Sequence, residues 1–118
     1  MNILVLNHRS IHNFSRTCRY VLELRIKLFI NQVSRASRKY ILAQGPLPST
    51  VGHFWLTVWQ RNSKAILMLN RVIERGQQKC HQYWPLHKGL TMDFPNVNLS
   101  LEHIDSEPGQ HYTVRTLK

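Results

Sequence analysis

The chain has 118 residues, which favours one domain at most and excludes large architectures built from two lobes. Apolar residues make up 42% of the sequence, and the uninterrupted apolar runs are far shorter than a bilayer is thick, so we expect no membrane span. The formal net charge of +10 is typical of proteins that bind nucleic acids or anionic surfaces.

The positive charge is concentrated in the first 39 residues. This segment holds eight of the sixteen Lys and Arg residues and a single acidic residue, Glu23. The other 79 residues have a net charge of +3, which is ordinary for a solvated surface. We therefore predict a basic N-terminal arm over residues 1–39. As an alternative function, this arm contacts nucleic acid or an anionic surface. As an alternative localisation, the arm targets the chain to mitochondria.

Two cysteines and seven histidines give no pattern of metal ligands. Cys18 and Cys80 form no CxxC motif, and the only closely spaced histidines, His8 and His12, lie in the arm. This arrangement favours neither a disulfide framework nor a structural zinc site, so we expect no metal and no cofactor. The N-terminus is a poor secretory signal, and the expected compartment is the reducing cytoplasm.

The first predicted element is a strand within residues 20–30, where apolar and charged positions alternate. Residues 31–39 are polar, small and basic, and they predict a loop. A short apolar run over residues 40–43 follows. Pro46 and Pro48 end it, because proline prevents both a helix interior and a central strand.

A helix is predicted over residues 50–61, with Ser49 or Thr50 as its N-cap and Asn62 at its end. The apolar positions at i, i+3, i+4 and i+7 are Val51, Phe54, Trp55 and Val58. The continuous apolar run 65–69 then predicts a strand that is buried on both faces.

A hairpin with Gly76 at its turn is predicted within residues 70–84. Residues 98–104 alternate again, and residues 112–117 form a last predicted strand. The expected fold class is therefore α+β, with one main helix and one sheet. Four aromatic residues are predicted to lie in the core: Trp55, Trp59, Tyr83 and Trp84.

Ordered blocks of sequence from Tyr40 onwards carry a family resemblance. They are YILAQGPLP, FWLTVW, MLNRVIERGQQKCHQYWP, NLSLEHIDSE and YTVR. In this order and spacing, residues 40–118 resemble part of the catalytic domain of the non-receptor protein tyrosine phosphatases. The resemblance implies a portion of a twisted mixed sheet. It also implies a family reaction in which phosphotyrosine proteins are hydrolysed through a cysteinyl-phosphate intermediate.

The resemblance assigns supporting roles to residues of the hairpin. Glu74 matches a family glutamate that holds the arginine of the phosphate-binding loop, and Lys79 matches a lysine that points toward the site. Their alternative interpretation is an exposed cross-strand pair. The other motif positions are matched as structural residues: Gln44, Gly45, Pro46, Asn70, Arg71, Cys80, Tyr83, Trp84 and Pro85. Of these, the first three are expected to form a turn that sets the following helix against the sheet.

The groups that perform the family's reaction are not found in the sequence. The family needs a Cys-x5-Arg loop, but Leu24 and Leu86 stand where Cys18 and Cys80 would require arginine. The Trp-Pro-Asp acid loop is also missing, because Trp84-Pro85 is followed by leucine. We therefore expect a truncated and catalytically inactive chain, a pseudoenzyme, with a marginal fold unless the predicted strand 20–30 pairs with the remainder.

The upstream phosphotyrosine-recognition loop of the family is not found in residues 1–39 either. The tripeptide Phe29-Ile30-Asn31 is a weak match to the Tyr-Ile-Asn of that region, with a shorter spacing to Tyr40 than the family pattern requires.

Overall fold

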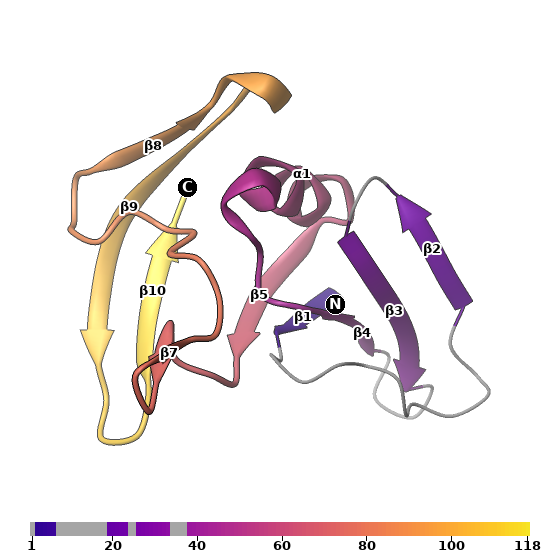
Figure 1. Ribbon diagram of the computed structural model, residues 1–118, viewed down its shortest axis with the longest axis horizontal. Coiled ribbons are helices and arrows are strands. Elements are labelled where there is room, and N and C mark those ends of the chain that lie inside the picture. The colour runs from indigo at the N-terminus through magenta and orange to yellow at the C-terminus, as the bar shows by residue number, and fades with distance from the viewer. Residues whose placement is uncertain (1, 7–18, 24–25, 34–37) are drawn as a thin grey trace. The chain divides into compact units, whose positions relative to one another are not determined.

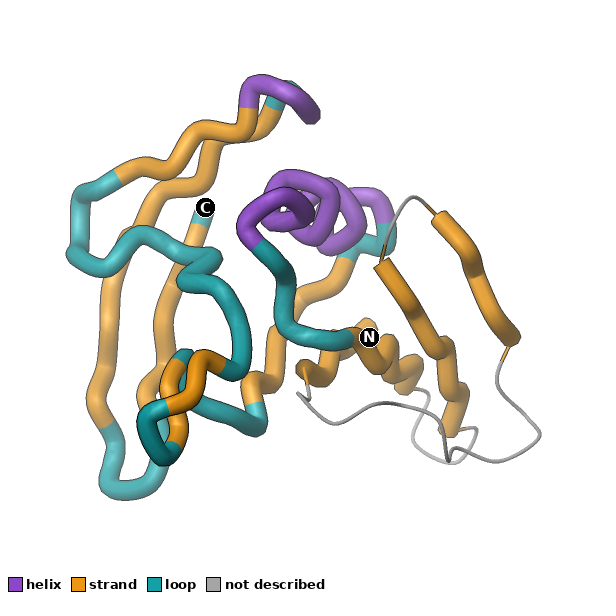
Figure 2. Tube along the Cα trace, in the orientation of Figure 1, coloured by secondary structure: helices purple, strands orange, loops and turns teal. Residues whose placement is uncertain are grey.

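The computed structural model describes residues 2–6, 19–23, 26–33 and 38–118, with the burial of side chains given from Lys39 onwards. The chain divides into two compact units, Met1–His81 and Gln82–Lys118. Among the described residues there are one α-helix and ten β-strands, so the predicted α+β class is confirmed (Figures 1 and 2).

The first unit contains a five-stranded mixed sheet with the strand order β2-β3-β4-β1-β5 (Figure 1). Strand β1 runs parallel to both of its neighbours, β4 and β5, whereas β2, β3 and β4 pair in antiparallel fashion. The five strands are β1 (Asn2–Leu6), β2 (Arg19–Glu23), β3 (Ile26–Val33), β4 (Arg38–Ala43) and β5 (Ser63–Met68). The mixed character of the sheet agrees with the family resemblance.

Two antiparallel strands, β2 and β3, replace the single strand predicted over residues 20–30. Arg19 pairs with Ile30 and Glu23 with Ile26, while residues 24–25 lie outside the described residues. This register joins odd-numbered to even-numbered positions, so one period of two does not run through both strands. The alternation therefore indicated the right secondary structure but the wrong number of strands.

The loop predicted over residues 31–39 is shorter than expected. Strand β3 continues to Val33 and β4 begins at Arg38, and the two strands pair with each other. The sequence analysis expects a marginal fold unless the strand within residues 20–30 pairs with the remainder, and this pairing is present, because β3 is hydrogen-bonded to β4. Strand β1, which the sequence analysis does not predict, adds the neighbour on the other side of β4.

Helix α1 (Val51–Gln60) confirms the predicted helix and contacts β5. Val51, Phe54 and Trp55 are buried, as their helical spacing predicts. A short 3-10 helix, Pro48–Thr50, precedes α1, and the Thr50 hydroxyl accepts a hydrogen bond from the backbone N–H of Leu47 (2.9 Å) instead of capping the helix. At the other end, Asn62 adopts a left-handed conformation (φ 49°) that stops the helix.

Two predictions of burial in this unit are wrong. Trp59 is 76% exposed, although its angular position on the helix lies between the buried Trp55 and Gly52. It stands in the last turn of α1, beyond Thr57, the last buried residue of the helix. Strand β5 is not buried on both faces: it stands at the edge of the sheet with Leu67 46% exposed. An edge strand has a neighbour on one side only, which periodicity in the sequence does not reveal.

The second unit is an antiparallel sheet with the strand order β10-β9-β8. Its strands are β8 (Thr91–Phe94), β9 (Leu99–Pro108) and β10 (Thr113–Leu117). The strands predicted over residues 98–104 and 112–117 are confirmed, whereas β8 was not predicted. Among the aromatic residues expected in the core, Trp84 is buried against Tyr83 with a ring distance of 4.7 Å, and the guanidinium of Arg115 lies 5.1 Å from the Trp84 ring.

Candidate functional site

The predicted hairpin is present, but it is shorter than the range 70–84. It consists of β6 (Ile73–Glu74) and β7 (Gln77–Gln78), joined by Arg75 and Gly76. Both turn residues have positive φ angles, 51° and 73°, as a two-residue turn of type I′ requires. Because Gly76 has no Cβ, it adopts this conformation without steric cost. One further bond, from the backbone N–H of Lys79 to Val72 O (2.8 Å), extends the ladder.

Glu74 and Lys79 are held by near neighbours rather than by each other. The backbone N–H of Arg71 donates to Oε1 of Glu74 (2.9 Å), and Nζ of Lys79 donates to Oε1 of Gln77 (3.0 Å). The exposed cross-strand pair that served as their alternative interpretation is therefore not the arrangement seen. Both side chains are partly exposed, and each makes one hydrogen bond to a residue within three positions of it.

The end of the hairpin is anchored by a buried cysteine. Cys80 is 4% exposed, and Nδ2 of Asn70 lies 3.7 Å from its sulfur while also donating to Arg71 O (2.9 Å). Burial raises the pKa of the Cys80 thiol, and the hydrogen bond from Asn70 opposes part of that rise. Since the thiolate is the nucleophilic form, a thiol in this setting is chemically inert.

The turn Gln44-Gly45-Pro46 packs directly on this anchor. A Cβ atom at Gly45 would overlap the Cβ of Cys80, so no larger residue fits there without displacement. The backbone N–H of His81 donates to Pro46 O (3.0 Å), which adds a backbone bond between the two segments. The structure therefore brings two separate sequence motifs together, and the turn fixes the hairpin rather than only the helix that follows it.

The remaining motif residues, Tyr83, Trp84 and Pro85, belong to the second unit, where all three are buried. Nε2 of Gln82 donates to Trp84 O (2.9 Å) within the same unit. Their part in the described structure is packing, as the sequence analysis expected for Tyr83 and Trp84.

Sequence reasoning missed one polar arrangement in this unit. His103 is 2% exposed and hydrogen-bonded through both ring nitrogens, and the only signal for it is its position two residues after the buried Leu101 on an alternating strand.

Residues 1–38 have no described side-chain contacts, so nothing in the structure favours the nucleic-acid or anionic-surface alternative. In the part of the chain that the structure describes, no group of three or more His, Cys, Asp and Glu residues is placed to hold a metal ion. No helix among these residues combines the length and the apolar character that crossing a bilayer requires.

Comparison with known proteins extends the resemblance noted in the sequence. The family model described as protein-tyrosine phosphatase matches residues 9–118. This range begins within the segment predicted to be a separate arm and includes strands β2 and β3. The boundary at residue 40 stays a prediction.

Individual relatives match most of the chain but cover little of their own length. Tyrosine-protein phosphatase non-receptor type 61F of Drosophila melanogaster is 48% identical over 89 residues, which is 74% of this chain and 16% of that protein. Tyrosine-protein phosphatase non-receptor type 2 of Homo sapiens is 44% identical over 86 residues, 73% of this chain and 20% of that protein. Tyrosine-protein phosphatase Lar-like of Caenorhabditis elegans is 42% identical over 81 residues, 69% of this chain and 4% of that protein. The chain thus spans a fifth or less of the length of these relatives.

Proposed function

Because the chain belongs to the protein-tyrosine phosphatase family, we propose that it supplies the glutamate-bearing hairpin and the supporting sheet of a phosphatase domain. In this proposal, the assembled domain acts on phosphotyrosine proteins, and the hairpin positions groups without performing the reaction. The observation that carries the proposal is the fixed direction of the Glu74 carboxylate.

The hydrogen bonding of Glu74 supports a role in orienting a cation. Its Oε1 accepts the backbone N–H of Arg71, and no donor among the described residues contacts its Oε2. A carboxylate held in this way can accept a charge-assisted hydrogen bond from the arginine of a phosphate-binding loop. An arginine held in place binds a phosphate dianion without first losing rotational freedom, so the glutamate acts by preorganising that arginine.

Lys79 supplies positive charge beside the same hairpin. An ammonium group has three donors, and the bond to Gln77 uses one of them. No residue in the described part of the chain is seen to bond to the other two, which can donate to a phosphate oxygen or to an acidic loop of the domain. The buried Cys80 and the close approach of Gly45 keep the base of the hairpin in place, which is what a positioning role requires.

We also propose that the 118-residue chain is inactive by itself, a pseudoenzyme. Neither cysteine begins a Cys-x5-Arg sequence, and no Trp-Pro-Asp sequence occurs. The nucleophile, the acid and the arginine act as a unit in this type of reaction, so their joint loss removes catalysis by several orders of magnitude. The inert setting of the Cys80 thiol agrees with this proposal.

Phosphate release from a phosphotyrosine peptide tests this inactivity. The purified chain should release phosphate no faster than buffer. Turnover that disappears in Cys80→Ser or Cys18→Ser would show that the chain carries its own nucleophile, and the proposal of inactivity would then fail.

The positioning role of Glu74 is tested in a complemented enzyme. The chain is combined with a polypeptide that carries a Cys-x5-Arg loop and a Trp-Pro-Asp loop of the family, and kcat/KM is measured for the same peptide. We expect Glu74→Gln to lower kcat/KM about 100-fold, because a misplaced arginine costs about that much. Glu107→Gln, an exposed glutamate in β9, is the matched control and should leave kcat/KM unchanged. An equal effect of the two substitutions would refute the role of Glu74.

We further propose that the protein functions in a reducing compartment, the cytoplasm. Cys80 is a free and buried thiol, which agrees with such a compartment. Microscopy of the tagged chain in cells tests this proposal, and accumulation in mitochondria would favour the alternative of mitochondrial targeting by the arm.

A further inference from the structure

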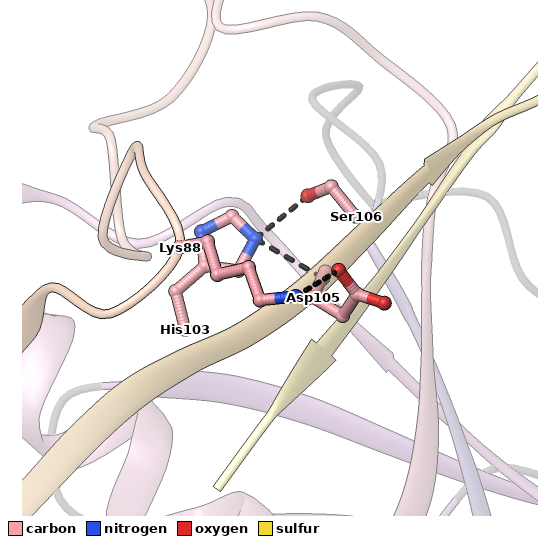
Figure 3. Close-up of polar contacts among 4 residues, drawn as sticks. All are labelled: Lys88, His103, Asp105 and Ser106. Atoms are coloured by element: carbon pink, nitrogen blue, oxygen red, sulfur yellow. Dashed lines mark hydrogen bonds and ion pairs between the residues drawn. The ribbon is translucent and has the colours of Figure 1, made fainter.

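A buried histidine and an exposed serine meet on strand β9 of the second unit (Figure 3). His103 is 2% exposed, whereas Ser106 lies at the surface three residues further along the strand. The Nε2 atom of His103 lies 2.6 Å from the Oγ atom of Ser106. The proposed phosphatase role uses neither residue, so this arrangement stands apart from it.

The second ring nitrogen of His103 determines the direction of this hydrogen bond. Nδ1 lies 2.7 Å from the backbone oxygen of Pro85, and a carbonyl oxygen only accepts hydrogen bonds. Nε2 also faces a carbonyl, that of Asp105, but the contact of Nδ1 is the shorter of the two, 2.7 Å against 3.1 Å. The proton of a neutral ring is therefore placed on Nδ1, which leaves the lone pair on Nε2. The Ser106 hydroxyl consequently donates to Nε2, as a nucleophile donates to its general base.

A third contact of the ring would stabilise the imidazolium that proton transfer produces. The backbone oxygen of Asp105 lies 3.1 Å from Nε2, which offers it no proton while the ring is neutral. Once Nε2 takes the serine proton, its N–H faces the oxygens of both Asp105 and Ser106. The imidazolium then has a carbonyl acceptor at each nitrogen, which is the arrangement that stabilises such a cation.

The carboxylate of Asp105 bonds to Lys88 and also accepts a hydrogen bond from the backbone N–H of Ser106. Nζ of Lys88 lies 3.1 Å from its Oδ1, and this hydrogen bond is the main cause of the lowered pKa of Asp105 (Figure 3). The carboxylate thus stays ionised and paired with lysine, while the backbone oxygen of the same residue faces the imidazole.

We propose that His103 activates Ser106 as a nucleophile that accepts the acyl group of small activated aryl esters. In this step the Oγ–H proton passes to Nε2 of His103 as Oγ bonds to the carbonyl carbon. The bond between that carbon and the aryloxy oxygen then breaks, and the leaving oxygen takes the proton or departs as aryl oxide. The products are acyl-Ser106 and the phenol, and no oxidant or reductant is needed.

The same strand contains a matched control. Ser100 is also exposed, and its Oγ lies 2.6 Å from Oδ1 of Asp93, the same distance as that from Ser106 to the histidine. The two serines thus differ in the chemistry of the acceptor. A carboxylate with a reference pKa of about 3.9 is a much weaker base at neutral pH than an imidazole, whose reference pKa is about 6.5.

The experiment treats the full chain with p-nitrophenyl acetate at neutral pH and follows acetylation of each serine by peptide mass spectrometry. We expect Ser106 to acetylate about 100-fold faster than Ser100, the low end of what a positioned general base contributes. In concentrated urea the two rates should become equal, because the preference depends on the folded arrangement. Equal rates in the native chain, or a preference that persists in urea, would overturn the proposal.

Two variants assign the roles. Ser106→Ala should remove the fast acetylation without affecting Ser100. His103→Gln keeps a polar side chain but provides no base, so acetylation of Ser106 should fall to the rate of Ser100. If Ser106 in a folded His103→Gln chain reacted at the original rate, histidine would have no part in its reactivity. The comparison of native and urea-treated wild-type chain decides the case even where His103→Gln does not fold.

Discussion

The hairpin of the first unit and the His103 arrangement of the second unit place polar groups in opposite settings. Glu74 and Lys79 are partly exposed, and each bonds to a neighbour within three residues. His103 is 2% exposed, and one of its bonds reaches Pro85, eighteen residues away. Water can replace the contacts of the hairpin but not those of the buried ring. We therefore expect Glu74 and Lys79, which the resemblance matches to a family role, to contribute little to stability, and His103, which the resemblance does not match, to contribute much.

Among the substitutions that test this comparison, His103→Ala should lower the free energy of unfolding most. It removes a buried ring and leaves the Pro85 oxygen without its donor, so we expect the free energy of unfolding to fall by about 3 kcal/mol. Urea unfolding followed by tryptophan fluorescence measures the change. His111→Ala is the control, since His111 is exposed, and it should change stability little. A loss for His103→Ala as small as that of the control would mean that the buried ring is not needed for packing.

A smaller loss is expected from Gly45→Ala in the first unit. The added Cβ would overlap Cys80, and overpacking of this kind costs about 2 kcal/mol. The same unfolding experiment measures it.

Gly76→Ala separates this steric effect from backbone strain. Gly76 has a φ of 73°, and no atom lies within 4 Å of the position that an added methyl group would take, so only the conformational cost of about 1 kcal/mol applies. If Gly45→Ala proved the milder of the two substitutions, the packing of the turn on Cys80 would not be what holds the hairpin.

The features that were predictable from the sequence depend on neighbouring residues. The turn at Gly76 needs two positive φ angles in succession, and helix α1 needs an apolar repeat, both of which lie within a few residues. The edge position of β5 depends on its pairing with β1, more than fifty residues earlier, and no local pattern encodes that pairing. Likewise, the alternation of β9 shows that residue 103 faces inward, but the bond to Pro85 is a tertiary contact.

The candidate site also combines features that nearby residues predict with features that depend on tertiary contacts. The resemblance selected Glu74 and Lys79 by spacing alone, and the structure added the bonds that fix their directions. It also shows two local bonds in place of the cross-strand pair that was the alternative interpretation of these residues. The contact between Gly45 and Cys80 joins segments thirty-five residues apart, so neither motif by itself predicted that the two segments pack together.

Glu74→Ala should change stability by less than about 0.5 kcal/mol, because its bond to Arg71 is exposed to solvent. This small value, together with the large loss of kcat/KM expected in the complemented enzyme, would separate function from stability at one residue. Urea unfolding of Glu74→Ala and Glu107→Ala under identical conditions measures it. A loss above about 1 kcal/mol for Glu74→Ala alone would place this residue with His103, as a residue that the fold needs.

The smallest effect concerns Asp105, which carries a contact of each type: an exposed carboxylate paired with Lys88 and a backbone oxygen near the buried ring. The hydrogen bond from Lys88 lowers the pKa of Asp105 in the folded chain. A lowered pKa contributes stability that is fully present above the ordinary value of about 3.9 and is lost as the pH falls through the lowered value. Lys88→Met should therefore raise the pKa of Asp105, as measured by NMR titration of its carboxyl carbon, and should weaken the acid dependence of unfolding at this residue. Because both partners are exposed, added salt should also bring the pKa of Asp105 in the wild-type chain closer to its ordinary value.

The acetylation of Ser106 should persist in Lys88→Met, since that reaction relies on the backbone oxygen of Asp105 and not on its carboxylate. If acetylation were lost together with the ion pair, the surface contact and the buried contact would be one coupled unit, and the separation between the two settings would not hold on this strand.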